Sequence, residues 1–273
     1  MAAEKQAARE EGEFKMELKL IEQKGNYASF LISDTSAAFV NALRRAVVSL
    51  VPVMAIEDVE IRSNNSALYD EIIAHRLGLI PLSTDLKTYN LPPKCNCKGK
   101  GCASCQVVLS LKAKGPCTVY ASDIKSKDPE VKPVFTKMPI VKLLKGQELQ
   151  VECTAILGQG TEHAKWNSGL AWYRLLPEFE FEKCDNPEVA VSACPTNVLE
   201  AKAGKLAVKA GKLYDCHLCE ACVDACPKGV KLVPSGKDFI FYVESFGQLS
   251  PKQIMVSAAD MLNEKVEEFK GLI

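Results

Sequence analysis

Four cysteines late in the chain follow a spacing that constrains the fold of the segment around them. Cys216, Cys219, Cys222 and Cys226 are separated by two, two and three residues, and Pro227 follows the last of them. Bacterial iron–sulfur proteins use this spacing to bind a 4Fe–4S cluster, because tight loops bring successive thiolates to neighbouring irons. The spacing therefore predicts an iron–sulfur site, and it leaves open whether the cluster holds four irons or three.

An earlier segment repeats this run with half of its cysteines missing. Residues 184–198 align without a gap on residues 216–230. The identical pairs are Cys184/Cys216, Glu188/Glu220, Val191/Val223, Ala193/Ala225, Cys194/Cys226, Pro195/Pro227 and Val198/Val230. In the earlier copy, Pro187 and Ala190 stand where the second and third cysteines would be. The repeat is typical of a two-cluster ferredoxin, here with enough ligands for one cluster.

The fourth cysteine of each run in a two-cluster ferredoxin binds the other cluster. This rule predicts the following ligands for the single cluster: Cys194, Cys216, Cys219 and Cys222. Cys184 and Cys226 would then face each other across the vacated site, as free thiols or as a redox-labile disulfide. The alternative assignment takes Cys226 as the fourth ligand, because it is closer in the sequence to the other three.

A second group of cysteines lies within a loop rich in lysine and glycine at residues 92–105. Its members are Cys95, Cys97, Cys102 and Cys105. Four thiolates this close together can bind one tetrahedral zinc ion, although the first pair is more tightly spaced than a usual zinc knuckle. The alternative is a loop of reduced thiols that remain from an ancestral site. Cys117 and Cys153 lie in strand-like segments, where we expect small buried side chains.

Composition excludes several classes of protein. The 273 residues include 34 lysines and arginines against 34 aspartates and glutamates, and this zero net charge argues against a free-standing nucleic-acid binder. The first residues form no signal peptide, and the longest apolar run, residues 46–56, is about half a membrane span. We therefore expect a soluble, cytosolic protein, in which thiols stay reduced and clustered cysteines bind metal.

Hydrophobic periodicity predicts an α+β fold. Strands are expected at residues 14–22, 27–33, 53–62, 106–113, 116–121, 148–157, 178–182 and 238–245. One apolar helical stripe comprises Phe39, Leu43, Val47 and Leu50, and a second comprises Ile254, Ala258, Met261, Leu262, Val266 and Phe269. A short helix is expected at residues 69–77. The three histidines, His75, His163 and His217, lie far apart, and no set of residues matches a catalytic motif.

Four segments resemble a known family in their order and spacing. They are FVNALRRA (39–46), IEDVEI (56–61), HRLGLIPL (75–82) and HAKW (163–166). The family is that of the third-largest subunit of cellular RNA polymerases, which is related to the N-terminal domain of the bacterial alpha subunit. The ferredoxin-like repeat resembles an insertion of the archaeal members, the D subunits. The resemblance covers essentially everything from residue 13 onward.

The resemblance implies a domain organisation. Residues 13–55 and 236–273 would form a split dimerisation domain, preceded by a flexible tail at residues 1–12. Residues 56–183 would form an inserted, mainly β domain that carries the cysteine-rich loop, and residues 184–235 a ferredoxin-like iron–sulfur domain. The loop resembles the zinc loop of eukaryotic relatives, with a different spacing.

The resemblance also implies a function and partners. The chain would be a non-catalytic assembly subunit of a DNA-directed RNA polymerase, a nucleotidyltransferase complex of the cytoplasm, and would meet DNA only within that complex. It would pair with the small subunit L, bind the two large catalytic subunits and carry the small subunits N and P. Candidate contact residues are Phe39, Leu43, Arg44, Arg45, Val47, His75 and Arg76. The alternative to a partner contact is that the two adjacent arginines lie on a solvated face of their helix.

Two other functions compete with this interpretation. The ferredoxin-like spacing also suits an electron-transfer subunit of an oxidoreductase, although one cluster cannot carry electrons far and no flavin or nicotinamide site accompanies it. The cysteine-rich loop suits a zinc-dependent binding or chaperone module. That module would require the loop and dispense with the terminal helices, whereas an assembly subunit would show the reverse.

Overall fold

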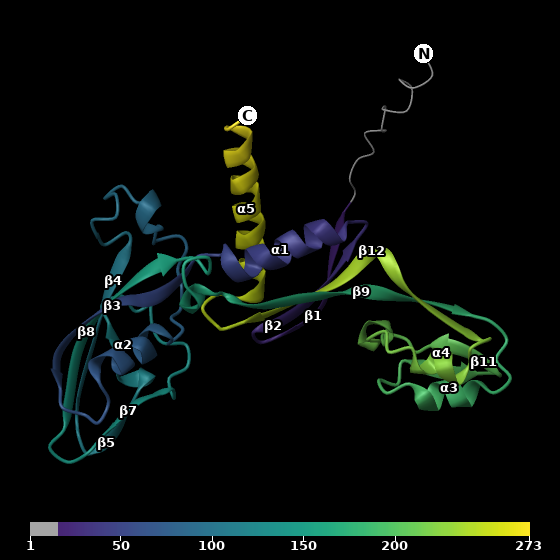
Figure 1. Ribbon diagram of the computed structural model, residues 1–273, viewed down its shortest axis with the longest axis horizontal. Helices are drawn as coiled ribbons and strands as arrows, with labels where there is room; N and C mark the ends of the chain where they lie inside the picture. The colour runs from purple at the N-terminus through teal and green to yellow at the C-terminus, as the bar shows by residue number, and fades with distance from the viewer. Residues whose placement is uncertain (1–15) are drawn as a thin grey trace. The chain divides into compact units, whose positions relative to one another are not determined.

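The computed structural model describes residues 16–273 (Figure 1). The tail predicted for residues 1–12 lies outside the described residues. The chain forms two compact units. The first comprises residues 16–22, Ser29–Val40 and Tyr173–Phe241, and the second comprises Gln23–Ala28, Asn41–Trp172 and Tyr242–Ile273. The predicted division into three domains stays a prediction.

Strands from early and late parts of the chain form a four-stranded sheet, in the order β1–β2–β12–β9. Their bounds are Glu17–Lys24 (β1), Tyr27–Ser33 (β2), Val230–Ser245 (β12) and Gly169–Phe181 (β9). Gly25 has a φ of +56° in the turn between β1 and β2, a left-handed conformation that favours glycine. β9 is much longer than the predicted strand at residues 178–182. The sheet tolerates Pro177 inside β9 because an edge strand has one side free of partner strands.

Helix α1 (Ala37–Ser49) carries the first predicted apolar stripe. The Ser36 hydroxyl accepts a hydrogen bond of 3.3 Å from the amide of Phe39, and so caps the helix. Leu43 and Val47 are buried. Phe39 is 37% exposed, whereas its neighbour Val40 is fully buried, so the buried face of α1 begins at Val40.

Helix α5 (Pro251–Lys270) carries the second stripe, of which the structure buries only the first part. Ser250 begins the helix as a capping box. Ile254 is fully buried, whereas Val266 and Phe269 are 51% and 62% exposed. The later turns of α5 thus present apolar side chains without cover from the described residues. No helix within the described part of the chain has the length and apolar character that a membrane span requires.

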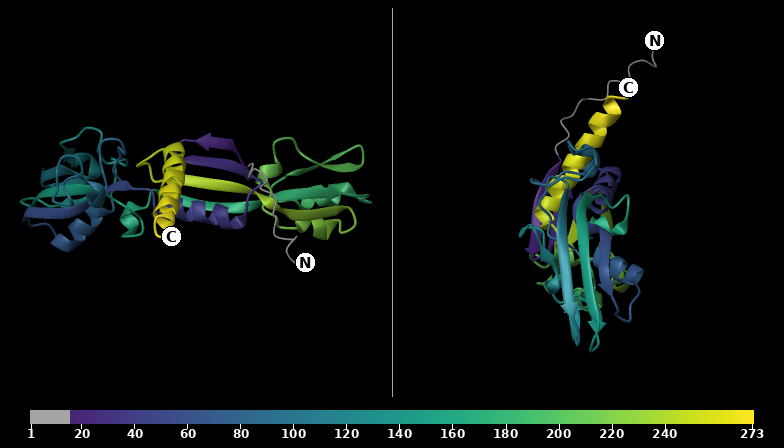
Figure 2. Two further views of the ribbon diagram at one scale, coloured as in Figure 1. Left: turned by 90° about the horizontal axis from the view of Figure 1, so that it is seen from above. Right: turned by 90° about the vertical axis from the view of Figure 1, so that its left-hand side faces the viewer.

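The second unit contains a further four-stranded sheet in the order β3–β8–β4–β6. Its strands are β3 (Val53–Asn64), β8 (Glu148–Gly158), β4 (Gln106–Lys114) and β6 (Lys125–Ser126). The long strands β4 and β8 pair antiparallel, side by side (Figure 2). A smaller ribbon pairs β5 (Cys117–Tyr120) with β7 (Pro139–Leu143). The sequence pattern predicts neither β6 nor β7, because one has two residues and the other begins at a proline.

Helix α2 (Asp70–Gly78) contributes Ile73 and Leu77 to the core of this unit. Cys153 on β8 is buried in the same core, as predicted. The prediction for Cys117 is wrong, because this residue is exposed. Cys117 is the first residue of a short ribbon strand and follows the turn at Gly115–Pro116, so no layer covers it. Short 3₁₀ helices occur at Pro92–Lys94 (η1), Ala121–Asp123 (η2) and Ala164–Trp166 (η3).

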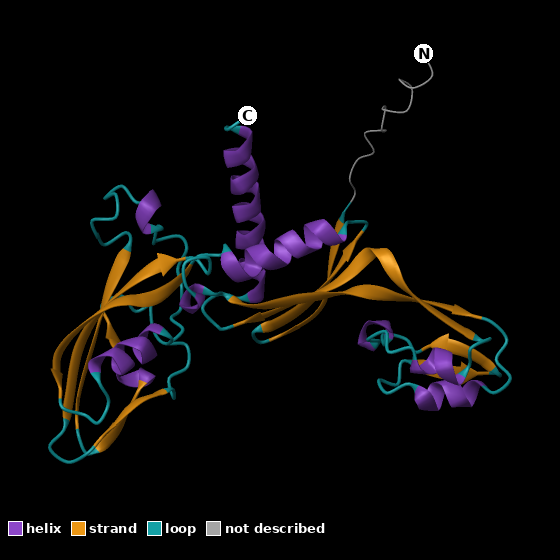
Figure 3. Ribbon diagram, viewed as in Figure 1, coloured by secondary structure: helices purple, strands orange, loops and turns teal. Residues whose placement is uncertain are grey.

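The cysteine-bearing repeat folds as a small cluster of elements in the first unit (Figure 3). They are α3 (Pro187–Ala193), β10 (Leu199–Lys202), β11 (Lys205–Val208), η4 (Leu213–Asp215) and α4 (Ala221–Ala225). Helix α3 contacts both α4 and the β10–β11 hairpin. Ala190, which replaces a repeat cysteine, is fully buried in the core of this cluster beside Cys222 and Cys226. A packed methyl group therefore occupies the lost ligand position.

Candidate metal centres and contact surfaces

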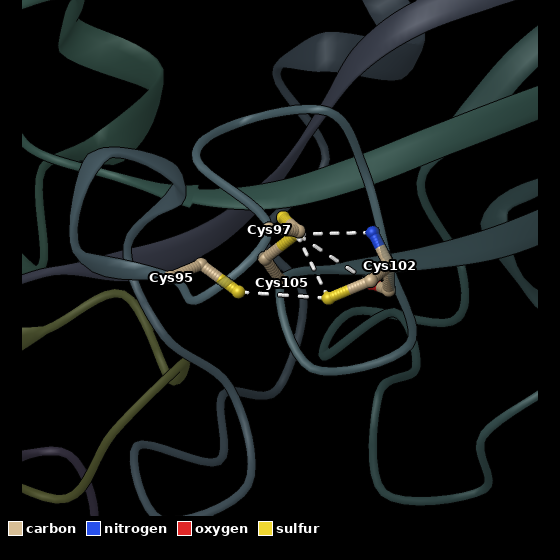
Figure 4. Close-up of side chains that lie close together, drawn as sticks. All are labelled: Cys95, Cys97, Cys102 and Cys105. Atoms are coloured by element: carbon tan, nitrogen blue, oxygen red, sulfur yellow. Dashed lines mark hydrogen bonds between the residues drawn. The ribbon is translucent and has the colours of Figure 1, made fainter.

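The structure brings together the four cysteines of the loop that precedes β4 (Figure 4). All four Sγ atoms lie within 4.8 Å of one another. The Sγ–Sγ distance is 3.5 Å for Cys95–Cys102 and for Cys97–Cys105, and 3.7 Å for Cys102–Cys105. Cys95 and Cys105 are buried, and the other two are half-buried. This group can bind a metal ion.

Tight backbone turns hold the thiols in this arrangement. The amide of Lys98 donates to the carbonyl of Cys95 at 2.9 Å, and the amide of Cys105 donates to the carbonyl of Cys102 at 3.0 Å. Between these turns Gly101 has a φ of +86°, which favours glycine. The amide of Cys102 also donates to the Cys105 sulfur at 3.2 Å, as amides around metal-bound thiolates do.

The sulfur geometry suits one tetrahedral ion. Zinc binds thiolates at about 2.3 Å, so a regular tetrahedron separates its sulfurs by about 3.8 Å. The distances of 3.5 Å and 3.7 Å are close to that value. An all-thiolate set of four is also the donor set that favours zinc or an iron–sulfur centre over magnesium or calcium.

The thiols of this group differ in their pKa values. Burial acts to raise the pKa of Cys97, but hydrogen bonds from its neighbouring thiols outweigh burial and lower it to about 6. Burial, together with those same neighbours, raises the pKa of Cys105 to about 12. One thiolate is therefore available near neutral pH, and metal binding would release the remaining protons.

The second cysteine group lies in the small cluster of the first unit. Cys194 directly follows α3, Cys216 follows η4, and Cys222 lies in α4. Leu218 and Glu220 both have positive φ, of 58° and 62°. Left-handed backbone at two non-glycine positions is uncommon. Cys216 and Cys222 on either side of this stretch are buried, whereas Cys219 within it is exposed.

The charge of Cys194 acts on two cysteines of this loop. Burial raises the pKa of Cys216 and of Cys222, and the charges of Cys194 and Cys219 raise both further. Such coupling requires the sulfurs to be near one another. Burial would also raise the pKa of Cys194, but the backbone amide of Val198, at 3.4 Å from its sulfur, contributes to a net lowering. The charge of Cys194 thus acts on both Cys216 and Cys222, whereas the set of cluster ligands stays a prediction.

Cys184 and Cys226 form a disulfide. The bond joins the segment after β9 to the residue that ends α4, across 42 residues of sequence. Gly229 packs against it, and a Cβ at this position would lie 2.6 Å from the Cys226 sulfur. Cys226 is therefore unavailable as a cluster ligand while the disulfide is intact.

Two of the separated histidines line one small pocket of about 270 Å³. His75 comes from α2, and His163 precedes η3. The His163 Nδ1 accepts a hydrogen bond of 3.0 Å from the amide of Lys165, whose ammonium group pairs with Glu57 and lies 4.4 Å from the Trp166 ring centroid. Sequence reasoning missed Glu57 and Lys165 as pocket residues, since no local pattern links segments so far apart.

Other predicted contact residues are spread over two helices. The Arg44 guanidinium is half-buried and donates to Asn41 at 3.1 Å, whereas Arg45 is exposed. On α2, Arg76 donates to the carbonyl of Ile140 and so ties the helix to β7. Arg76 therefore has a packing role within the unit, whatever else it contacts.

Known proteins resemble this chain over nearly its whole length. Residues 59–171 match the RNA polymerase Rpb3/RpoA insert domain. DNA-directed RNA polymerase subunit Rpo3 of Methanosarcina acetivorans is 37% identical over 261 residues, which are 94% of this chain and 98% of the relative. The chain belongs to the Rpo3 family.

Two further Rpo3 proteins show a similar degree of likeness. Rpo3 of Archaeoglobus fulgidus is 36% identical over 259 residues, covering 94% of this chain and 97% of the relative. Rpo3 of Methanothermobacter thermautotrophicus is 40% identical over 259 residues, covering 93% and 97%. The family resemblance expected from the four segments is thereby confirmed, and the fold is the mixed α+β of an Rpo3 chain with an insert domain.

The Rpo3 insert domain contains one of the two cysteine groups. Its matched range includes the Cys95–Cys105 loop, α2 and both histidines of the pocket, whereas the pocket residues Ile56 and Glu57 precede it. The disulfide and the second cysteine group lie outside this range but within the full-length similarity to Rpo3. The names of the relatives mention neither a metal nor a cluster.

Proposed function

We propose that this chain is a non-catalytic assembly subunit of a DNA-directed RNA polymerase. The observation that carries the proposal is the similarity, over 94% of the chain, to relatives named as subunit Rpo3 of that enzyme. Exposed apolar surfaces at several elements support a role in binding other subunits, because monomeric proteins rarely expose large apolar patches.

One such surface lies on the later turns of α5 and the residues after it. Val266, Phe269, Leu272 and Ile273 are all at least half exposed. A second lies on the edge strand β1, where Leu18 is 55% and Leu20 is 50% exposed. We assign both to a heterodimer with the small subunit L, with Phe39, Leu43 and Val47 of α1 at or behind the interface.

The outer face of α2 is the proposed contact with the large catalytic subunits. Ile72 of α2 is 46% exposed, and the residues that flank the helix, Tyr69 and Leu79, are 80% and 45% exposed. The pocket of His75 and His163 lies beside them and would bind one side chain of the partner. Arg44 and Arg45 of α1 supply further charged contacts, and the small subunits N and P complete the assembly.

Both cysteine groups are proposed to be structural metal centres. Cys95, Cys97, Cys102 and Cys105 would hold one zinc ion, and Cys194, Cys216, Cys219 and Cys222 one iron–sulfur cluster of the 4Fe–4S or 3Fe–4S type. A bound metal links segments that have few apolar contacts of their own, and its binding free energy becomes folding free energy. The cysteines position the metal, and the amides of Cys102 and Val198 stabilise the thiolate charge.

The test is reconstitution of the polymerase from separate subunits. Val266→Asp together with Phe269→Asp places two charges on the exposed face of α5, and Asn263→Asp is a control that adds one charge to an exposed polar position of the same helix. We expect the double variant to fold but to lose the pairing with subunit L, whereas the control assembles. Normal assembly of the double variant would contradict the proposed interface.

A further inference from the structure

Helix α5 is covered by the rest of the second unit along only part of its length. Ile254 is fully buried, and the side chain of Met261 is half-buried. Residues 265–273 are all exposed. Between these two stretches Glu264 is half-buried and pairs with Lys94. Glu264 therefore lies at the turn where the covered part of α5 ends and the uncovered part begins.

The partner of Glu264 belongs to the cysteine-rich loop. Lys94 is the last residue of η1 and directly precedes Cys95. The amide of Lys94 donates to the carbonyl of Leu91 at 2.9 Å, and the amide of Cys95 donates to the carbonyl of Pro92 at 3.3 Å. A single 3₁₀ turn thus determines the position of both the lysine of the ion pair and one of the four clustered cysteines.

The loop has little besides its cysteines to hold this turn in place. The amide of Asn90 donates to the carbonyl of Ser104 at 2.8 Å, and this bond joins the two ends of the loop. Residues 92–105, all of which the structure describes, contribute no side chain to the hydrophobic core of the second unit. A metal ion bound by all four thiols would link Cys95 to the far side of the loop, and its binding free energy would order the segment.

A weak contact is enough to affect the end of α5. The side chains of Lys94 and Glu264 are 50% and 40% exposed, and ion pairs at such positions contribute little to the stability of a whole domain. A helix end without tertiary cover opens at a small cost in free energy, however, because packing supplies most of the stability of a helix. Residues 261–270 are therefore the part of α5 that responds to this pair.

We propose that metal binding in the cysteine-rich loop orders the later turns of α5, through η1 and the Lys94–Glu264 ion pair. The bound ion fixes the turn that carries Lys94, and Lys94 holds Glu264. Without the ion, this turn moves freely and the pair no longer restrains the helix. Lys94 and Glu264 are positioning residues in this account, and the ion acts on a helix that provides none of its ligands. The proposal rests on the proposed metal centre and is independent of the proposed membership of the polymerase.

The test is amide hydrogen exchange on the full chain, supplied with zinc under anaerobic conditions, with the zinc content measured on the same sample. We expect Cys102→Ser, which removes one ligand and with it the zinc, to speed exchange at residues 261–270 about two- to fivefold. Residues 251–258 should exchange at an unchanged rate, because buried side chains hold this part of the helix. Unchanged exchange at residues 261–270 in a zinc-free variant would overturn the proposal. A wild-type chain that binds no zinc would overturn the metal centre and this proposal with it.

Substitutions of the ion pair identify the link between the loop and the helix. In Lys94→Met the loop should retain its zinc, whereas residues 261–270 should exchange as fast as in Cys102→Ser. Lys94→Glu together with Glu264→Lys keeps a pair with its charges exchanged, and should restore slow exchange. Lys100→Met is the matched control, since Lys100 is an exposed lysine of the same loop that forms no ion pair with any described residue. Slow exchange that persists in Lys94→Met would overturn the ion pair as the link.

Discussion

At the scale of single residues, the spacing of cysteines carried most of the information about the candidate sites. The four cysteines of the loop at residues 92–105 are found together as the spacing predicts. Their partners are near in sequence, so short turns suffice to gather them. The pocket of Glu57, His75, His163 and Lys165 could not be predicted in this way. Its members come from β3, α2 and the η3 segment, and only the tertiary fold brings these together.

The fourth ligand of the proposed iron–sulfur cluster is testable with one pair of substitutions. We expect Cys194→Ser to abolish cluster binding, because the fourth cysteine of each run in a two-cluster ferredoxin binds the other cluster. Cys226→Ser should leave most of the cluster in place, because Cys226 is bonded to Cys184. Iron and sulfide content of anaerobically purified protein provides the measurement. The opposite ranking would show that Cys226 is the ligand.

Tyr89 gives a prediction about pH. Its hydroxyl donates to Asp128 at 2.6 Å, and burial, reinforced by this carboxylate, raises the pKa of Tyr89 above its ordinary range. A raised pKa stabilises the fold fully below the unfolded value of about 10, and this contribution is lost as pH rises through the folded value. Tyr89→Phe should therefore cost about 1 kcal/mol at pH 8. Denaturant unfolding of both proteins between pH 8 and 11 should show the difference shrinking, and a constant difference would contradict this.

At the scale of elements, the two amphipathic helices and the central strands could be predicted from the sequence, whereas the residues at which the strands begin and end were harder to predict. Helix α5 begins at Pro251, where a serine cap and a proline in the first turn are local signals of a helix start. β9 and β12 both extend beyond their predicted bounds, through Pro177 and Pro234 respectively. Because proline is disfavoured within strands, the sequence pattern predicts that a strand ends at the proline. In the sheet, both strands continue past it.

The cysteine-rich loop should lose its order when its metal is removed. We expect Cys102→Ser to remove the bound zinc and to speed tryptic cleavage after Lys98 and Lys100, which are exposed in this loop. Cys117→Ser is the control, because Cys117 is exposed and outside the metal group. Metal analysis and limited proteolysis measure the two effects. Unchanged cleavage and an unchanged zinc content in Cys102→Ser would contradict a metal centre here.

The disulfide should stabilise the small cluster of elements that it closes. It spans 42 residues, for which the chain-entropy estimate is about 4 kcal/mol as an upper value. We expect Cys184→Ser to lower the free energy of unfolding of this cluster by up to that amount, with the second unit unaffected. Amide hydrogen exchange of α3 and α4, compared with that of β4 and β8, distinguishes a loss of stability in the small cluster from a loss in the second unit. Equal loss of protection in both would contradict a local effect.

At the scale of the whole molecule, a family resemblance in four short segments anticipated the assignment to Rpo3 better than composition did. Composition and charge excluded some classes of protein but indicated no function. The partners follow from no pattern within the chain. What the structure adds is a set of exposed apolar surfaces on α2, α5 and β1, each without cover among the described residues.

The central claim is that the chain acts within a polymerase, and an anaerobic affinity purification from the native cell tests it most directly. The purified complex would be sized and assayed for template-dependent nucleotide incorporation. We expect a large multisubunit complex with that activity, in which this chain is present in stoichiometric amount. A small complex that is inactive on nucleotides but oxidises or reduces a dye would contradict the claim, and would favour an electron-transfer role for the cysteine-bearing repeat.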